Sequence, residues 1–441
     1  METTNTTGNK YEGVEKRRKR AACTSSTEPL HTHTQDTQQK CVAGSIDSGS
    51  AESSSVPFLK TKITTEDKER FRKTFESLDS KKFWVLKATR EAAAAAGPDV
   101  IPVSVEEKMA AFALSSNFLH PAHSLILDVD ENSWADVFTK EELIEIQNEE
   151  PPLIRQTPEE LDQLLKEIHG MSTEDVYRYS RSLPHDPSKD HLKTWFSLTL
   201  TNSASSFLCD NTGIGRIGEA DAMSTCTPHI IGYCALDKMC IKKLTTFFSD
   251  SKELGSKANS FAQNSKRKLS GLEEAQKARG GRRMDTIYKG GEVEYGAVEI
   301  GNRADSTKEL NDSRLKLPIV LKDMFLKIHD YAPELQNKIH IVGYNINGLS
   351  VQLMDFDSPH GYVGRIRRTK YTDYPTSKIE FTTRISTLIR LAALGENIIK
   401  ETEASLANFD KALVSSKSLS KRTSRSSSTS TNQEPSSSSS P

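Results

Sequence analysis

The sequence lacks a long hydrophobic run at any point along its 441 residues. Crossing a bilayer takes roughly 18 to 20 consecutive apolar residues, and no window of the chain reaches that length. The stretch from Met1 to Lys10 is polar and holds no apolar segment of the kind that a secretory signal carries. These absences argue against a membrane partner and predict a nuclear or cytoplasmic protein.

Cysteine and net charge are also scarce. The chain has six cysteines, none of them in a CxxC pair, which excludes a small disulfide-built scaffold and predicts free thiols in a reducing compartment. The formal net charge is -1, so the total charge indicates no class of partner. Hydrophobic residues make up 35% of the chain, a low share that indicates segments outside any core.

Two such segments lie at the ends. Residues 1–57 are rich in Thr, Ser, Gln and Gly and predict a disordered tail, because they cannot bury enough apolar surface to offset the entropy of ordering. Residues 413–441 predict a second disordered tail, rich in Ser. Lys16–Arg20 is a run of basic residues within the first tail. It fits either a nuclear import receptor or a solvated charge run that keeps the tail soluble.

Between the tails, residues 58–170 predict a helical region. A capped start at Thr65-Glu66-Asp67 predicts a helix that continues through the Ala92–Ala96 run until Gly97-Pro98 stops it. Further helices are expected over 104–117, 139–148 and 158–169.

Residues 171–412 predict a second domain of mixed character. Helices are expected over 188–208, 317–331 and 381–404, and strands over 284–289, 293–300, 339–344, 349–356 and 361–368. The predicted fold class is therefore α/β, more narrowly α+β. A helical N-terminal part is followed by a small mixed sheet flanked by helices.

The hairpin over 284–300 carries the most suggestive acidic residues. A two-residue turn at Gly290-Gly291 would pair residue 285 with 296 and place Glu294 on the face of Asp285. One more turn residue, or a bulge, would pair 285 with 297 and bring Glu299 to that face instead. Two carboxylates at such spacing can hold Mg²⁺ with a water that attacks a phosphodiester. The alternative is that these acids are ordinary surface charges.

Four motifs carry a resemblance to known proteins. They are Arg283-x-Asp285, then Glu294-Tyr-Gly-x-x-Glu299-x-Gly301, then the Lys-Leu-Pro-x-x-Leu-Lys-Asp-Met stretch from Lys316, and the Ile-x-x-x-Gly-Tyr-x-x-x-Gly stretch from Ile339. The chain resembles a group of uncharacterised fungal proteins that are similar to the PD-(D/E)XK, or restriction-endonuclease-like, nuclease superfamily. The resemblance covers roughly residues 105–404.

The resemblance implies a nuclease site in which Asp285 and Glu299 are the two acids that hold Mg²⁺, with support from Glu219. The superfamily has a lysine two residues after the second acid, where this chain has Gly301. Losing such a group costs on the order of a hundred- to a thousand-fold in rate. Either catalysis is lost or another cation takes its place, supplied by Arg303, Lys316 or Lys322.

Two basic stretches favour a nucleic-acid partner. The first contains Lys266, Arg267, Lys268, Lys277, Arg279, Arg282 and Arg283. The second contains Arg365, Arg367, Arg368 and Lys370, with Tyr371 and Tyr374 beside them for stacking on bases. The alternative for the second stretch is an edge strand guarded by charge.

These observations together predict a DNA- or RNA-binding protein with a PD-(D/E)XK-like nuclease domain. That domain is either catalytically degenerate or uses a lysine from elsewhere in the chain, and if active it is a Mg²⁺-dependent phosphodiesterase. Two alternatives remain at this point: a non-enzymatic scaffold for protein interactions, and the relic of a mobile element.

Overall fold

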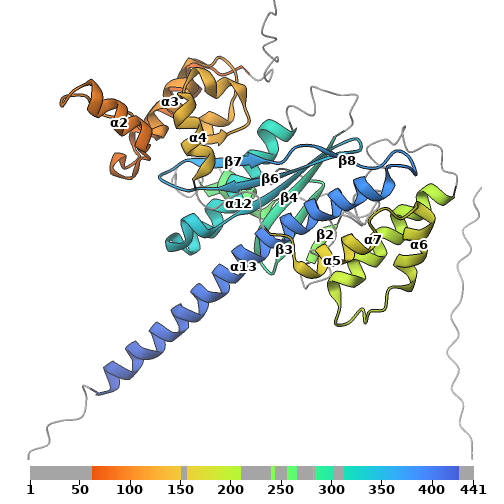
Figure 1. Ribbon diagram of the computed structural model, residues 1–441. Helices are drawn as coiled ribbons and strands as arrows, with labels where there is room; N and C mark the ends of the chain where they lie inside the picture. The colour runs from red at the N-terminus through yellow and green to blue at the C-terminus, as the bar shows by residue number, and fades with distance from the viewer. Residues whose placement is uncertain are drawn as a thin grey trace, which may run out of the picture. The chain divides into compact units, whose positions relative to one another are not determined.

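The structure is a computed structural model that describes residues 62–149, 156–209, 240–243, 256–265, 282, 284–301 and 312–426 (Figure 1). These residues belong to one compact unit, Pro57–Pro441. Several predictions lie outside the described residues. They concern the tail over 1–57 with Lys16–Arg20, the end of the chain after Ser426, and the residues Glu219, Lys266, Arg267, Lys268, Lys277, Arg279, Arg283 and Arg303.

The N-terminal part of the described chain is built from short helices. Three of them begin at a capping box, in which a Thr or Ser side chain and the acidic side chain three residues later exchange hydrogen bonds with the backbone. The elements are α1 (Thr65–Glu76), η1 (Ser80–Lys82), α2 (Lys87–Ala96), α3 (Val105–Ser115), η2 (Pro121–Ser124), η3 (Asn132–Asp136) and α4 (Lys140–Asn148).

The single helix expected through the Ala92–Ala96 run is wrong, because α1 and α2 are separate. Asp79 accepts a hydrogen bond from the backbone N–H of Lys81 at 3.1 Å and so begins the short turn η1 between them. After this turn the chain runs extended, and Trp84 and Leu86 are 6% and 1% exposed. Burying these two side chains in the apolar cluster of the helical part outweighs the helical propensity of the segment.

A single mixed sheet lies at the centre of the described chain (Figure 1). Its strand order is β1-β7-β6-β5-β4-β3-β2, and β8 also pairs with β6. The β1–β7 and β4–β5 pairs are parallel and the others are antiparallel. The strands are β1 (Ile126–Asp128), β2 (Cys240–Lys243), β3 (Thr286–Gly290), β4 (Val293–Gly301), β5 (Ile341–Asn347), β6 (Ser350–Asp357), β7 (Gly364–Arg368) and β8 (Thr372–Asp373).

Two helices, α12 (Leu317–Tyr331) and α13 (Phe381–Ser426), cover opposite faces of the sheet. Successive residues of β5 show this, since neighbouring side chains of a strand point to opposite faces. A Cβ added at Gly343 would lie 2.8 Å from Leu321 of α12. The next residue, Tyr344, donates its hydroxyl to the carbonyl of Ala392 in α13 at 3.4 Å. The apolar core therefore lies on both sides of the central strands.

The remaining helices pack on the same core through buried residues such as Leu161, Trp195 and Ala258. They are α5 (Glu159–Glu167), α6 (Thr173–Ser182), α7 (His191–Leu208) and α10 (Lys257–Ser265); a turn, η8 (Pro333–Lys338), follows α12.

The predicted mixed α+β class is confirmed, as are the hairpin, α12 and the β5–β6 pair. The short strands β1, β2 and β8 were not expected. β1 matters most, because it brings a strand of the expected helical region into the sheet beside β7. Helix α13 continues past the boundary expected at residue 412. Within the described residues, no helix is long and apolar enough to cross a membrane.

Candidate functional site

The register of the β3–β4 hairpin differs from both registers that the sequence suggested. Gly290 pairs with Val293, so the turn is Gly291-Glu292, and Gly291 takes the positive φ of +60° that glycine tolerates. A bulge then shifts the pairing between Tyr288 and Lys289. The two shifts add up, so the predicted pairings of residue 285 with 296 or 297 are wrong.

The observed register places Asp285, the residue before β3, beside the segment 298–300 of β4. Thr286 pairs with Val298, and the backbone N–H of Asp285 donates to the carbonyl of Val298 at 3.1 Å. The Asp285 carboxylate accepts a hydrogen bond from the backbone N–H of Ile300 at 2.7 Å, which fixes its orientation. Of the two acids that the resemblance singled out, Asp285 therefore lies just before β3 and bonds to the residue that follows Glu299 in β4.

Glu294, the other candidate acid of the hairpin, has a different role. Its carboxylate accepts hydrogen bonds from the hydroxyl of Ser256 at 2.7 Å and from the backbone N–H groups of Lys257 and Ala258 at 2.8 Å and 3.2 Å. These are the first N–H groups of α10, so Glu294 caps that helix and neutralises its N-terminal dipole.

Lys316 lies beside Glu299. Its ammonium donates to Oε1 of Glu299 at 2.5 Å, and the two side chains are 25% and 5% exposed. Lys316 is the last residue of η7 (Asp312–Lys316), a π-helical turn that leads into α12. The Arg368 guanidinium donates to the carbonyl of Ser313 at 3.1 Å and so holds this turn against the sheet.

A row of polar side chains continues from Glu299 across the same face. Glu299 is level with Asn345 on β5, and Asn345 is level with Gln352 on β6. The amide of Asn345 donates to the Tyr371 hydroxyl at 2.7 Å, and the Arg368 guanidinium donates to Oε1 of Gln352 at 3.2 Å. We call Asp285, which precedes β3, together with Glu299, Asn345, Gln352 and Arg368, which lie on the adjacent strands β4, β5, β6 and β7, the polar row.

Arg368 ends the row in an acidic setting. Its Nε donates to Asp128 at 2.7 Å, and its backbone N–H donates to Asp130 at 3.1 Å. Burial and the neighbouring Asp128 charge raise the pKa of the Asp130 carboxyl above its ordinary value. Arg368 therefore serves first to neutralise acids at the end of β1.

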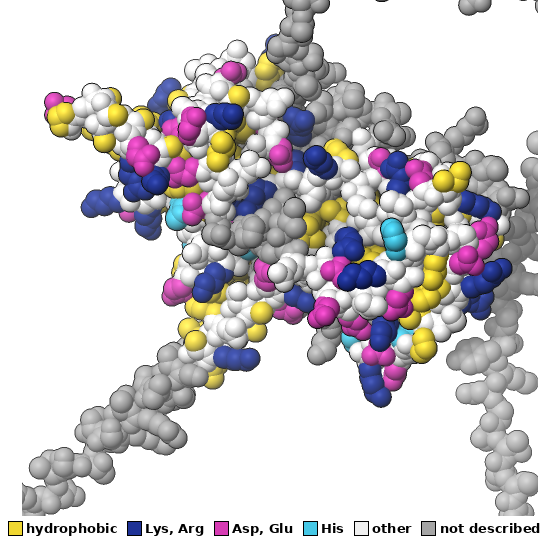
Figure 2. All heavy atoms as spheres, in the orientation of Figure 1, with side chains coloured by type: hydrophobic (Ala, Val, Ile, Leu, Met, Phe, Trp, Pro, Cys, Tyr) yellow, Lys and Arg dark blue, Asp and Glu magenta, His cyan; other side chains and the backbone are white. Residues whose placement is uncertain are grey.

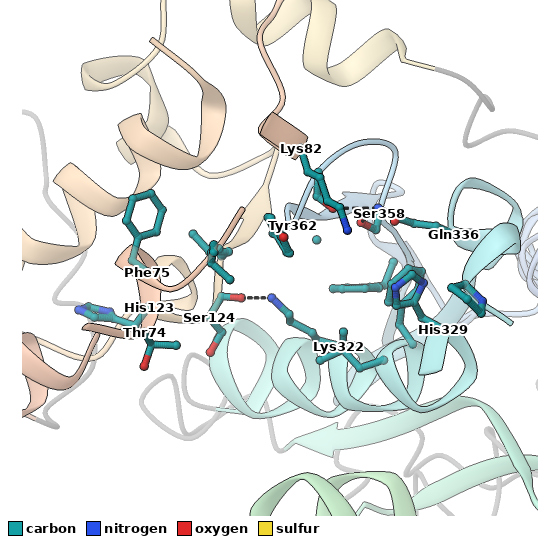
Figure 3. A pocket seen from close by; sticks show the side chains of 18 of the residues that line it. Thr74, Phe75, Lys82, His123, Ser124, Lys322, His329, Gln336, Ser358 and Tyr362 are labelled. Carbon is teal, nitrogen blue, oxygen red and sulfur yellow. Dashed lines mark hydrogen bonds between the residues drawn. The ribbon is translucent and has the colours of Figure 1, made fainter. Parts of the chain in front are cut away.

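Lys322, the other lysine proposed to replace the motif cation, lies elsewhere. It lines a pocket, where its ammonium donates to the carbonyl of Ser124 (Figure 3). Burial lowers the pKa of this ammonium to about 8. Of the two, the structure brings only Lys316 to the acids.

The second basic stretch is not an exposed cluster. Arg365 is 0% exposed, pairs with both oxygens of Asp357 at 2.9 Å and 2.5 Å, and donates to the carbonyl of Ile146 at 2.7 Å. Arg367 is 3% exposed and pairs with Asp355 at 2.9 Å. The prediction that Arg365 and Arg367 contact phosphates is therefore wrong: they act as internal counter-ions, because adjacent buried strands present carboxylates to them.

On the face drawn in Figure 2, the described residues form no broad basic field in their place. Over the described part of the face in Figure 2, Lys and Arg side chains are interspersed with Asp and Glu. Arg282, from the first basic stretch, is partly buried, and its backbone N–H donates to the side chain of Asn259 at 2.8 Å.

The acids of the polar row fit a hard cation in type and number. Mg²⁺ is usually bound through one or two carboxylates, with waters and substrate phosphates completing the shell. Asp285, before β3, and Glu299, in β4, supply two such carboxylates. The described residues contain no group of three or more His, Cys, Asp and Glu that could hold a metal. Glu219, the third acid suggested by the sequence, lies outside them.

No family model matches this chain, and no curated protein and no solved structure matches it. The polar row was missed in part from the sequence, since Asn345, Gln352 and Tyr371 were not singled out. A signal was present, however. Asn345 and Gln352 each interrupt a run of apolar residues on a strand that is buried on both faces, where a polar side chain needs a partner.

Proposed function

We propose that the chain is a metal-dependent phosphodiesterase acting on nucleic acid, a PD-(D/E)XK-like nuclease whose lysine is supplied by Lys316. The observation that carries this proposal is the position of the Lys316 ammonium, 2.5 Å from the Glu299 carboxylate. Gly301 leaves the motif position without a side chain, and a cation from η7 occupies the neighbouring space instead.

The fold supports the proposal, because it has the small mixed sheet flanked by helices that the resemblance implied. The sheet is mixed and is flanked by α12 and α13; Glu299 lies in β4, and Asp285 directly precedes the antiparallel neighbour β3. As part of the proposal, we assign this sheet and its flanking helices to the restriction-endonuclease-like fold.

The roles of the residues follow from their positions. Mg²⁺, when bound, would supply a water of lowered pKa and neutralise phosphate charge. Asp285 and Glu299 would hold it, and the N–H of Ile300 keeps the Asp285 carboxylate oriented. Lys316 would stabilise negative charge that develops on the phosphate.

Tyr371 supports nucleic acid as the substrate class. It is 44% exposed, and its hydroxyl accepts a hydrogen bond from Asn345 of the polar row. An exposed aromatic ring held beside the acids can stack on a base, an interaction that tolerates any sequence. Recognition through stacking would compensate for the buried state of Arg365 and Arg367.

Cleavage by the full chain tests the proposal. Supercoiled plasmid DNA, single-stranded DNA and single-stranded RNA are incubated with the protein in Mg²⁺, in Mn²⁺ and in EDTA. We expect metal-dependent cleavage of at least one substrate, and we expect Asp285→Asn to abolish it. Lys327→Met, which removes a charge from α12 outside the site, is the control and should retain cleavage. Cleavage that survives in Asp285→Asn, or no cleavage of any substrate, would refute the nuclease assignment.

A second function, binding of nucleic acid without cleavage, is favoured by one observation. Glu299 is only 4% exposed, and it is already paired with a cation. A site in which Lys316 permanently neutralises Glu299 would bind phosphates without holding a metal. Salt-sensitive binding of single-stranded DNA that is unchanged by EDTA, with no cleavage, would select this function.

A further inference from the structure

A pocket of about 560 Å³ lies between the N-terminal helices and α12 (Figure 3). It is walled by α1, by the turn η2 and the residue after it, by α12, and by residues at the edges of β6 and β7. A volume of this size falls within the range of small-molecule sites, roughly 300–1,000 Å³.

Much of the wall is aromatic or aliphatic. Phe325 of α12 packs against Phe356 of β6 with ring centroids 5.6 Å apart, and it stacks on His329 at 6.0 Å. On the opposite side, Phe71 and Phe75 of α1 are 6.3 Å apart. These rings form a chamber suited to an apolar body.

The polar groups of the wall are basic or neutral. Its ionisable side chains are Lys82, His123, Lys322 and His329, and the described lining includes no Asp or Glu. Figure 3 shows Lys82 and Lys322 reaching into the pocket from opposite sides. An apolar chamber with two ammonium groups and no carboxylate in its wall attracts negative charge.

Two groups in the wall have unused hydrogen-bonding capacity among the described residues. His329 Nδ1 is buried and has no hydrogen-bond partner there. The Lys322 ammonium has three N–H donors, and the carbonyl of Ser124 accepts one of them. Buried donors and acceptors are normally satisfied, so these groups indicate a missing polar partner.

We propose that this pocket binds a small amphipathic anion, an apolar body carrying one carboxylate or phosphate head. The head accepts hydrogen bonds from Lys322 and the apolar body lies among Phe71, Phe75, Phe325 and Phe356. None of these residues belongs to the polar row, so the proposal stands or fails independently of the nuclease function.

Binding to the full chain tests the proposal, with decanoate and decyl phosphate as probes below the concentrations at which they form micelles. Isothermal titration calorimetry measures affinity, and the thermal midpoint reports stabilisation. Two control ligands share the ten-carbon chain: decanol carries no charge, and decyltrimethylammonium carries a positive charge in place of the negative one. We expect at least one anion to bind and raise the midpoint, and decanol to bind at least about tenfold more weakly, as loss of a charged hydrogen bond implies. The two anions identify the head group.

Variants locate the site. Lys322→Met keeps the length of the side chain without its charge and should bring the affinity for the anion down to that for decanol. Lys327→Met, on the same helix but outside the pocket wall, is the matched control and should bind as the wild type does. Leu326→Trp, at a lining position that is 38% exposed, should obstruct the chamber and weaken all the probes while leaving the fold intact. Equal affinities for anion and alcohol, no binding of either anion, or wild-type affinity in Lys322→Met would each overturn the proposal.

Discussion

The ammonium of Lys316 lies 2.5 Å from Oε1 of Glu299, and this contact joins the turn before α12 to the central strand β4. In sequence the motif lysine is missing, since Gly301 stands in its place. In space a lysine is present, because η7 passes over the same face of the sheet. Substitutions can separate the effect of this ion pair on cleavage from the effects of the other charged residues on binding and stability.

The exposed ring of Tyr371 should contribute to affinity rather than to chemistry. We expect Tyr371→Ala to weaken binding of single-stranded DNA by about 1–3 kcal/mol, the usual contribution of one base stacked on an aromatic ring. Tyr371→Phe should keep the affinity, since stacking needs only the ring. Fluorescence anisotropy in EDTA measures binding without cleavage. Unchanged affinity in Tyr371→Ala would remove this residue from the interface.

Glu294 and Glu299 should give opposite results, although both are buried acids of the same strand. We expect Glu294→Gln to lower the free energy of unfolding by about 1–3 kcal/mol, because it weakens charged hydrogen bonds to Ser256, Lys257 and Ala258. Cleavage should persist. Glu299→Gln should abolish cleavage. Urea unfolding and a plasmid cleavage assay measure the two effects, and loss of cleavage in Glu294→Gln at unchanged stability would contradict the assignment.

Arg365 should act on stability alone. Replacing it with Met leaves the Asp357 carboxylate buried without its bidentate partner, which costs about 3–5 kcal/mol when a buried pair is broken. Arg72→Met, which breaks an exposed pair with Glu69, should cost less than about 1 kcal/mol. Urea unfolding compares the two. The salt dependence of nucleic-acid binding should be the same in the wild type and in folded Arg365→Met, because no phosphate contact is lost.

Lys322 should make stability depend on pH in the alkaline range. Its pKa is about 8 in the folded chain against an ordinary 10.5, so between these values the unfolded chain binds the proton and the folded chain does not. Stability contributed by this group therefore rises with pH from about 8 to 10.5, by up to about 3 kcal/mol at 1.36 kcal/mol per unit. The neighbouring Asp323 charge acts in the opposite direction on the Lys322 pKa and limits the shift.

The difference in unfolding free energy between the wild type and Lys322→Met isolates this effect from other titrating groups. We expect the difference to change in favour of the wild type as pH rises over that interval. A difference that stays constant from pH 7 to 10.5 would show that the ammonium is not desolvated in the fold.

Much of the fold followed from local patterns. The apolar spacing of 317–331, with Pro318 at its start, predicted α12 with the bounds observed, and the glycine-containing turns marked both hairpins. The exact register of β3 and β4 did not follow. The register depends on a two-residue turn at Gly291-Glu292, one position later than the expected Gly290-Gly291, and on a bulge beside Tyr288. Packing across the sheet selects both features, and the residue types of the turn do not determine them.

The charged residues show a second limit of sequence reasoning. Arg365 and Arg367 look like an exposed basic strand until Asp355 and Asp357 of the neighbouring strand are placed opposite them. The sequence offered Arg303, Lys316 and Lys322 as candidates for the replacement cation, and of these Lys316 and Lys322 lie within the described residues. Only the packing of α12 on the sheet distinguishes Lys316 from Lys322, because Lys316 then contacts Glu299 and Lys322 lines the pocket.

The most direct measurement of the central claim is a rescue experiment on the metal-dependent cleavage rate. Gly301 has room for a side chain, since an added Cβ would lie 3.9 Å from its nearest neighbour, the carbonyl oxygen of Ile346. We expect Lys316→Met to lower the rate by about a hundred- to a thousand-fold, and the double variant with Gly301→Lys to recover a large part of it. Cleavage by Lys316→Met at the wild-type rate would contradict the account.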